Sequence, residues 1–361
     1  MEFLREVAPN SIEAWGSVIL GIWVVLMISM ERIFPYTKGV KFFRRGFWMD
    51  LVWYTIIQSY LLKILIFDWI IAPGKSALGL SELGYISHWP IWVLVLFFLI
   101  SHDFYIYWFH RLQHSNRWLW RTHEAHHSVR ECDWLAGSRS HAVEILINQT
   151  IEFAPIFFLL DNKTAAIIVP IKALLDAIWG MWIHANINVK TGKLQYVING
   201  PEMHQWHHAN HEEVFYANYS TKFAFFDWIF GTAFMPGLNP IKWPALKPLS
   251  FGLPYAYPED FFSQTVYAFW RYDFKKIENA KWYRSVQDSR QYLLNAVTFS
   301  RARHWLRDHI FDRSNARYEV DDAVPNCGCG RPMKQYNNGL QWGWHCDCEE
   351  SQVGELSKFG V

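Results

Sequence analysis

The sequence predicts an all-α integral membrane protein with about four to five membrane-embedded helices. Five apolar stretches support this prediction, because each is close to the roughly 17–25 residues that a membrane-spanning helix needs. These stretches cover residues 14–30, 51–72, 83–101, 145–160 and 164–183. The second observation is the distribution of histidine, since 12 of the 16 histidines fall between His102 and His211, close to the last three stretches.

The first two stretches are interpreted as spanning helices. The first carries no charged residue, and it reads as a retained anchor rather than a signal peptide. Glu2, Arg5 and Glu6 precede it and no small-residue cleavage site follows it. The second stretch is interrupted only by Lys63 and Asp68.

The fourth and fifth stretches predict a helical hairpin that spans the membrane at least in part. Glu152, Lys172 and Asp176 interrupt it. Charged side chains inside a membrane are costly and usually pair with one another. Because Lys172 and Asp176 are four residues apart, we expect them to form an ion pair on one helix face.

The connecting segments predict the orientation of the bundle. Residues 38–45 contain four basic side chains, whereas residues 73–88 contain a single lysine. Since cytoplasmic loops are enriched in lysine and arginine, the first segment is expected on the cytosolic side. Counting the passes from there puts every histidine-rich segment on the same, cytosolic, face of a multi-pass protein.

Composition divides the chain into three parts. Residues 1–240 contain the apolar stretches and the histidines, and they are interpreted as a membrane domain. Residues 241–313 are less apolar and predict cytosolic or interfacial helices, and residues 314–361 form a cysteine-containing tail. The formal net charge is only +1, so nothing in the charge predicts a nucleic-acid partner.

Three histidine clusters have spacings that suit metal binding. Side chains three and four residues apart lie on one helix face, so such histidines can converge on one ion. A single buried histidine is usually an ordinary core residue, but eight beside a membrane would be costly without a partner. Eight ligands exceed the capacity of one ion, and imidazole suits Fe, Zn, Cu or Ni rather than Mg²⁺ or Ca²⁺. The clusters therefore predict a cytosolic helical cap with a dimetal site, held by His110, His114, His123, His126, His127, His204, His207 and His208.

Further residues are placed by the same helical geometry. His184 ends the fifth stretch on the metal side and is predicted as a ninth ligand, and His141 is a further candidate. His102 lies about 12 Å deeper than His110 along the helix, which disfavours it as a ligand. Asp103 shares the face of His110 and is predicted to accept a hydrogen bond from a ligating imidazole.

The histidine motifs and their flanks resemble the fatty acid hydroxylase / sterol desaturase superfamily. The resemblance covers residues 103–236 and lies in the segments DFYIYWFHRLQH, LWRTHEAHHS, SRSHAVE, IHANI, HQWHH, NYS and FDWIFGTAF. It implies that the eight clustered histidines bind two irons on the cytosolic side. His184 and His141 match the family through their surrounding motifs.

The resemblance also implies the chemistry and the partners. O₂ would be the co-substrate that oxidises a C–H bond of a lipid, and the electrons would come from an external donor of the cytochrome b5 or ferredoxin type. A haem-binding HPGG motif does not occur in the sequence, so a fused cytochrome b5 domain is not expected.

The C-terminal tail contains two C-x-C pairs. Thiols stay reduced in the cytosol, so the pairs predict one structural zinc ion in a tetrahedral site. A disulfide pair or unbound thiols are the alternatives. The four residues are Cys327, Cys329, Cys346 and Cys348.

The resulting hypothesis is a membrane-bound di-iron oxygenase that hydroxylates a fatty acyl chain, a sterol or hopanoid, or a related lipid. A lipid desaturase on the same site is the first alternative. A membrane metal-binding or transport protein is a more distant one. A transporter would need titratable residues across the whole membrane, whereas here the histidines are concentrated at one edge.

Overall fold

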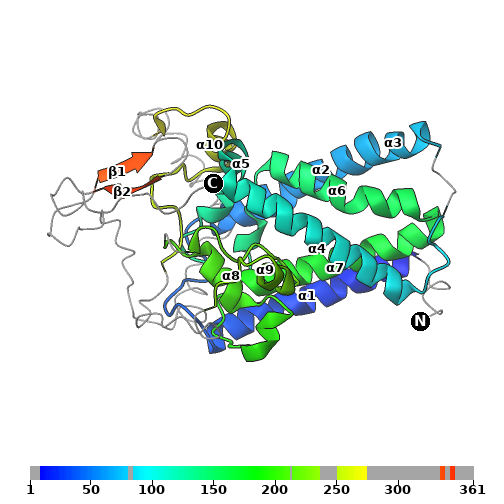
Figure 1. Cartoon of the computed structure of the whole chain (residues 1–361), viewed down its shortest axis with the longest axis horizontal. Helices are drawn as coiled ribbons and strands as arrows, with labels where there is room; N and C mark the ends of the chain where they lie inside the picture. The colour runs from blue at the N-terminus through cyan, green and yellow to red at the C-terminus, as the bar shows by residue number, and fades with distance from the viewer. Residues whose placement is uncertain are drawn as a thin grey trace, which may run out of the picture.

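The computed structural model describes residues 9–79, 84–211, 214–235 and 250–274, together with two strands at 334–337 and 342–345. Five long helical segments lie side by side in a bundle (Figure 1). All five are long and apolar enough to cross a membrane. They are α1 (Pro9–Ile33), a composite helix over Met49–Ala77, α4 (Ile91–Ser115), α6 (Ala142–Leu159) and α7 (Asn162–His184).

The composite helix changes its winding along its length without a break. Its consecutive parts are η2 (Met49–Gln58), α2 (Ser59–Ile64), η3 (Leu65–Ile71) and α3 (Ala72–Ala77), of which η2 and η3 are π-helical. The wider turns of a π-helix shift the register of the side chains that follow it.

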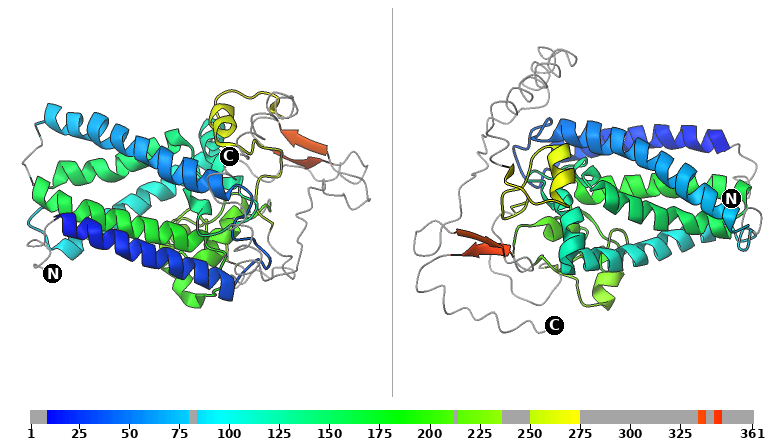
Figure 2. Two further views of the ribbon diagram at one scale, coloured as in Figure 1. Left: turned by 180° about the vertical axis from the view of Figure 1, so that it is seen from behind. Right: turned by 90° about the horizontal axis from the view of Figure 1, so that it is seen from above.

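Short elements form a cap at one end of the bundle. α5, α8 and α10 gather at the end opposite to the one where the chain enters α1 (Figures 1 and 2). The cap elements are α5 (Arg117–His127), η4 (Ala136–Ser138), η5 (Gly192–Tyr196), α8 (Pro201–His208), α9 (Phe225–Ile229) and α10 (Phe261–Tyr267).

The third membrane helix starts later than the apolar stretch predicts. The stretch begins at residue 83, but Pro90 has an extended backbone with ψ of 139° and α4 begins at Ile91. Proline fixes φ and favours such a position at a helix start. From there α4 runs for 25 residues without interruption, so it carries His110 and His114 beyond the apolar part into the cap.

The bundle has an apolar core and an apolar outer surface. Leu94, Phe98, Ile156 and Ile168 are buried between the composite helix, α4, α6 and α7. The outer face of α1 stays uncovered, and its Ile22 side chain is 64% exposed. A large uncovered apolar face of this kind suits contact with lipid, in agreement with an integral membrane fold.

The prediction of an all-α fold holds for the membrane bundle, but the tail contains two β-strands. β1 (Lys334–Asn337) pairs with β2 (Trp342–His345) in an antiparallel hairpin. Residues 275–333 lie outside the described part of the chain, so the helices expected there are untested beyond α10.

A buried ionic cluster ties the second helix to the cap. Arg44 contacts the Asp50 carboxylate at 2.8 Å and Asp133 at 2.7 Å. Arg139 donates to both oxygens of Asp50, at 2.7 and 3.0 Å. All four side chains are almost fully buried, so each charge depends on its partners for solvation.

Replacing Asp50 by asparagine should therefore destabilise the protein strongly. Two buried guanidinium groups would lose their shared carboxylate, at a cost of about 3–5 kcal/mol. Thermal unfolding in detergent should show a markedly lower midpoint for Asp50→Asn. The matched control is Glu259→Gln, which breaks the ion pair with Arg45 that is about half exposed to solvent. Such a pair contributes at most about 1 kcal/mol, and equal midpoints for the two variants would contradict the structural role of Asp50.

Candidate metal centre

Four helices bring nine histidines together where the bundle meets the cap. The ends of α4, α5 and α8 and the last residue of α7 each contribute. The side chain of Asn116 caps α5 by accepting from the backbone N–H groups of Trp118 and Leu119. This cap reverses the chain directly after α4 and sets α5 against it.

The nine imidazoles form two adjacent groups. Within each group every ring offers one nitrogen, and these nitrogens all lie within 4.8 Å of one another. Ring centroids of His127 and His208, one from each group, are 4.5 Å apart. The first group is His110, His114, His123, His127 and His207, and the second is His126, His184, His204 and His208.

Helical periodicity divides each H-x₂-H-H motif between the two groups. On α5, His123 and His127 are four residues apart and share the first group, whereas His126 turns to the second. On α8 the allocation is reversed, because the four-residue pair His204 and His208 lies in the second group. Each short helix therefore serves both groups.

The outer nitrogens of five rings are held by fixed acceptors. The Nδ1 atoms of His110, His126, His184 and His207 contact backbone carbonyl oxygens at 2.7–3.1 Å, and His123 Nδ1 lies 2.9 Å from a carboxylate oxygen of Glu144. Carbonyl and carboxylate oxygens only accept, so each Nδ1 carries the proton and leaves the Nε2 lone pair free to bind a metal. The carbonyl partners are Tyr219, Arg139, Gly180 and Ala217, in the order of the four rings.

The inner nitrogens face one another. Four Nε2 pairs are 2.9, 3.0, 3.1 and 3.3 Å apart, and the Nε2 atoms of His114, His127 and His207 have no hydrogen-bond partner among the described residues. Lone pairs that meet at such distances repel unless a cation lies between them. The close pairs are His110–His123, His126–His184, His184–His204 and His204–His208.

Burial keeps the cap histidines neutral. It lowers the pKa of each imidazole on α5 and α8 well below the ordinary value, and neighbouring imidazoles lower it further. Neutral imidazole is the form that binds a metal. The donor set therefore fits a metal site of the kind that imidazole favours.

Two residues outside the histidines shape the site. Gly137 in η4 lies against the ring of His184, and a Cβ atom there would come within 2.5 Å of Nδ1. Only glycine allows this approach. Asp227 accepts from the backbone N–H groups of Tyr219 and Ser220 at 2.8 and 2.9 Å, and so fixes the loop whose Tyr219 carbonyl holds His110.

The predicted contact between Asp103 and the ligating imidazoles is not formed. Asp103 instead accepts from the Thr221 hydroxyl and from the backbone N–H groups of Lys222 and Phe223. Asp103 shares a helix face with His110, but seven residues of helix separate them by about 10 Å. A shared helix face sets the direction of a side chain but not its reach along the helix axis.

Glu144 is the carboxylate that contacts a histidine of the site, and sequence reasoning missed it. It lies in the first turn of α6, 21 residues after His123, and is buried. The available signal was an acidic residue at the start of a membrane helix, within the quoted motif SRSHAVE.

His141 and His102 lie outside both groups. His141 caps α6 by accepting from Val143 N–H at 3.2 Å, and its Nε2 lies 3.2 Å from the carbonyl oxygen of Thr265. Both nitrogens are thus engaged, so the ligand role expected for His141 is not what the structure shows. His102 contacts Lys172 instead. The four tail cysteines lie outside the described residues.

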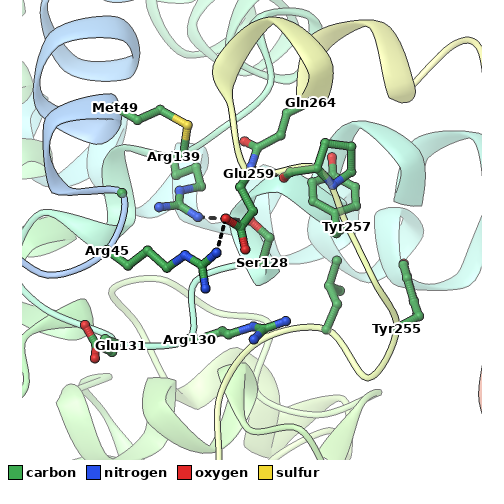
Figure 3. A pocket seen from close by; sticks show the side chains of 13 residues that line it. Arg45, Met49, Ser128, Arg130, Glu131, Arg139, Tyr255, Tyr257, Glu259 and Gln264 are labelled. Carbon is green, nitrogen blue, oxygen red and sulfur yellow. Dashed lines mark hydrogen bonds and ion pairs between the residues drawn. The ribbon is translucent and has the colours of Figure 1, made fainter. Parts of the chain in front are cut away.

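Two cavities adjoin the site. One, of about 190 Å³, lies against five of the nine histidines and extends between α4, α6 and α7. The other, of about 140 Å³, is bordered by Arg139, whose carbonyl holds His126 (Figure 3). In this second cavity Arg45 is paired with Glu259, and Arg139 donates to Ser128 at 3.1 Å.

Comparison with known proteins agrees with this site. Residues 95–232 match the family model for fatty acid hydroxylase. An ornithine lipid hydroxylase of Rhizobium tropici is 26% identical over 62% of this chain and 68% of its own length. An alkylglycerol monooxygenase of Xenopus tropicalis is 26% identical over 49% of this chain and 37% of its own length. A putative methylsterol monooxygenase of Dictyostelium discoideum is 28% identical over 50% of this chain and 67% of its own length. No solved structure matches the chain.

Residues 95–232, the part of the chain that carries the site, match the fatty acid hydroxylase family, and the relatives named above support this match. The matched region contains all nine histidines of the two groups. Its relatives are named as hydroxylases and monooxygenases, which are oxidoreductases. The chain spans about two thirds of the ornithine lipid hydroxylase and little more than a third of the alkylglycerol monooxygenase.

Glu144→Gln should weaken metal binding by about 10–100-fold, the usual effect of losing a partner that orients a ligand. The amide keeps the volume but removes the charge beside His123. Metal retention during dialysis against a graded chelator series measures the effect, and Glu13→Gln on the exposed face of α1 is the matched control. Unchanged retention in Glu144→Gln would show that this carboxylate does not support the site.

Proposed function

We propose that the chain is a membrane-bound lipid hydroxylase that holds two irons, one in each histidine group. The observation that carries the proposal is the pair of buried groups with inward-facing Nε2 atoms. A single ion cannot accept nine imidazoles, and imidazole is a good ligand for iron. The relatives named for hydroxylation and monooxygenation of lipids favour hydroxylation over desaturation.

Irons bound in these groups would supply the reductive activation of O₂ and the oxidation of a C–H bond. In the balanced reaction one oxygen atom enters the C–H bond and the other leaves as water, with two electrons and two protons consumed. An external donor of the cytochrome b5 or ferredoxin type would provide the electrons. The protein's own contribution is positioning.

The helices position the lipid for this reaction. α4 and α7 both rise from the apolar bundle and end in histidines of the site, so a substrate between them meets the metals at the edge of the apolar layer. We place this edge, and the cap, on the cytosolic side because residues 38–45 are rich in basic side chains. Residues 1–240 would then form the membrane oxygenase domain.

The metal content and the product test the proposed function together. Protein purified without oxygen should contain about two irons per chain, and lipids from cells that express it should include a species heavier by one oxygen atom. His126→Ala should lose both the metal and the product. His88→Ala, an exposed histidine far from both groups, is the control that should keep them. One metal or fewer in folded wild-type protein would refute the two-iron proposal.

The orientation has a separate test. In a chain whose native cysteines are replaced by serine, Ser76→Cys and Ser115→Cys put single exposed thiols at opposite ends of the bundle. An impermeant maleimide added outside intact cells should label Ser76→Cys, and Ser115→Cys should react only after lysis. The reverse pattern would place the metal site on the outer face.

A further inference from the structure

The short cap helix α10 and the turn after it carry a row of exposed apolar side chains. The row consists of Phe262, Val266, Phe269 and Trp270, and the exposed fraction of these residues runs from 46% at Val266 to 72% at Trp270. Residues three and four positions apart lie on one face of a helix, so the row follows a single face of α10. We call these four residues the outer stripe.

The opposite face of α10 buries a polar residue. Gln264 is almost fully buried, and its side chain accepts from the Tyr54 hydroxyl at 2.6 Å and donates to the carbonyl oxygen of Pro258 at 2.7 Å. A helix on the surface of a water-soluble domain has the reverse arrangement, with its apolar side chains inside and its polar ones outside. In an apolar medium, by contrast, polar groups have to find their partners inside the protein. The inverted polarity of α10 therefore indicates that its outer stripe faces an apolar medium.

α10 packs against the cap end of a helix that is long and apolar enough to span a membrane. Trp53 of the composite helix stacks on Phe261 with ring centroids 5.6 Å apart and meets Phe262 edge-on at 4.8 Å (Figure 2). Further along, the same composite helix exposes Ile56 and Tyr60. The outer stripe thus adjoins the uncovered apolar surface of the bundle, which suits contact with lipid.

Contacts with α6 fix which way α10 faces. His141 at the start of α6 has its Nε2 atom 3.2 Å from the carbonyl oxygen of Thr265, and its ring centroid lies 5.3 Å from that of Phe269. The Asp260 carboxylate also caps α10 by accepting from the backbone N–H of Ser263 at 3.0 Å. These contacts hold the buried face of α10 inward, so the outer stripe stays directed away from the bundle.

We propose that the outer stripe of α10 inserts among the acyl chains of the membrane leaflet on the cap side. α10 has seven residues, about 10 Å of helix, so it lies at the membrane surface and does not span the layer of about 30 Å. Apolar side chains on one face of such a helix suit this boundary. The insertion holds the cap, and with it the histidine site, at the lipid surface.

Fluorescence quenching by brominated phospholipid tests the insertion. Val266→Cys carries a bimane label in a full chain whose native cysteines are replaced by serine, with one chain in each nanodisc of neutral phosphatidylcholine. Its emission should shift to the blue and lose intensity in brominated lipid, because bromine quenches a probe that it contacts. Trp270→Cys should behave in the same way and gives a second position on the stripe.

Two control positions calibrate the result. Ile22→Cys lies on the exposed outer face of α1 and should be quenched, whereas Ser115→Cys lies exposed at the cap end of α4 and should not. Quenching at Val266→Cys should also persist at high salt, since apolar contact does not depend on charges that salt screens.

Three outcomes would overturn the proposal. Quenching no greater than at Ser115→Cys would place the outer stripe in water. A blue shift without quenching would show that the stripe is covered by protein, such as residues after 274. Quenching that disappears at high salt would show attachment to charged headgroups in place of insertion among acyl chains. None of these outcomes depends on the metals or on lipid oxidation, so the proposed hydroxylase function stands or falls separately.

Discussion

Nine neutral imidazoles point into one buried volume, and the hydrogen-bonding and metal-binding needs of their nitrogens constrain distant parts of the structure. Each ring has an inner nitrogen that needs a cation and an outer nitrogen that needs an acceptor. Backbone carbonyls supply most of the outer acceptors, so loops distant in sequence have to be held rigidly. Asp227 fixes the loop whose carbonyl serves His110, and the Asp50–Arg139 contact fixes the carbonyl that serves His126. These buried carboxylates act on the site through the backbone.

The membrane bundle determines where the nine imidazoles can all find partners for their nitrogens. α4 and α7 pass through the apolar layer and carry their histidines of the metal site only at the cap end, where short helices can turn back over them. α5 and α8 each send histidines to both groups, so neither group can form without both helices. The two groups are therefore one cooperative unit, and the loss of either short helix would expose ring nitrogens of both.

The sequence predicted the parts of this arrangement that are local. Apolar length predicted the five spans, and the four-residue spacings predicted histidine pairs that share a group. The pairs three residues apart were also expected to converge, but they fall in different groups. The sequence could not predict long-range contacts. Glu144 contacts His123 only because α6 packs beside α5. The predicted contact of Asp103 with a ligating histidine is not formed, because a shared helix face does not determine how far a side chain reaches along the axis. His141 resembled a ligand by motif, but its position at the start of α6 makes it a helix cap.

A buried ionic cluster of Lys172, Glu152, Asp176 and Lys222 lies beside the histidine site. Lys172 and Lys222 join α7 to the cap loop through Asp176, and the same loop holds Asp103 and the Tyr219 carbonyl. Keeping four buried charges is costly even when they pair. Their pairing contributes rigidity between α7 and the loop, and Asp176 and Lys222 also line the cavity that adjoins the histidines. One set of residues thus joins α7 to the loop whose Tyr219 carbonyl holds His110.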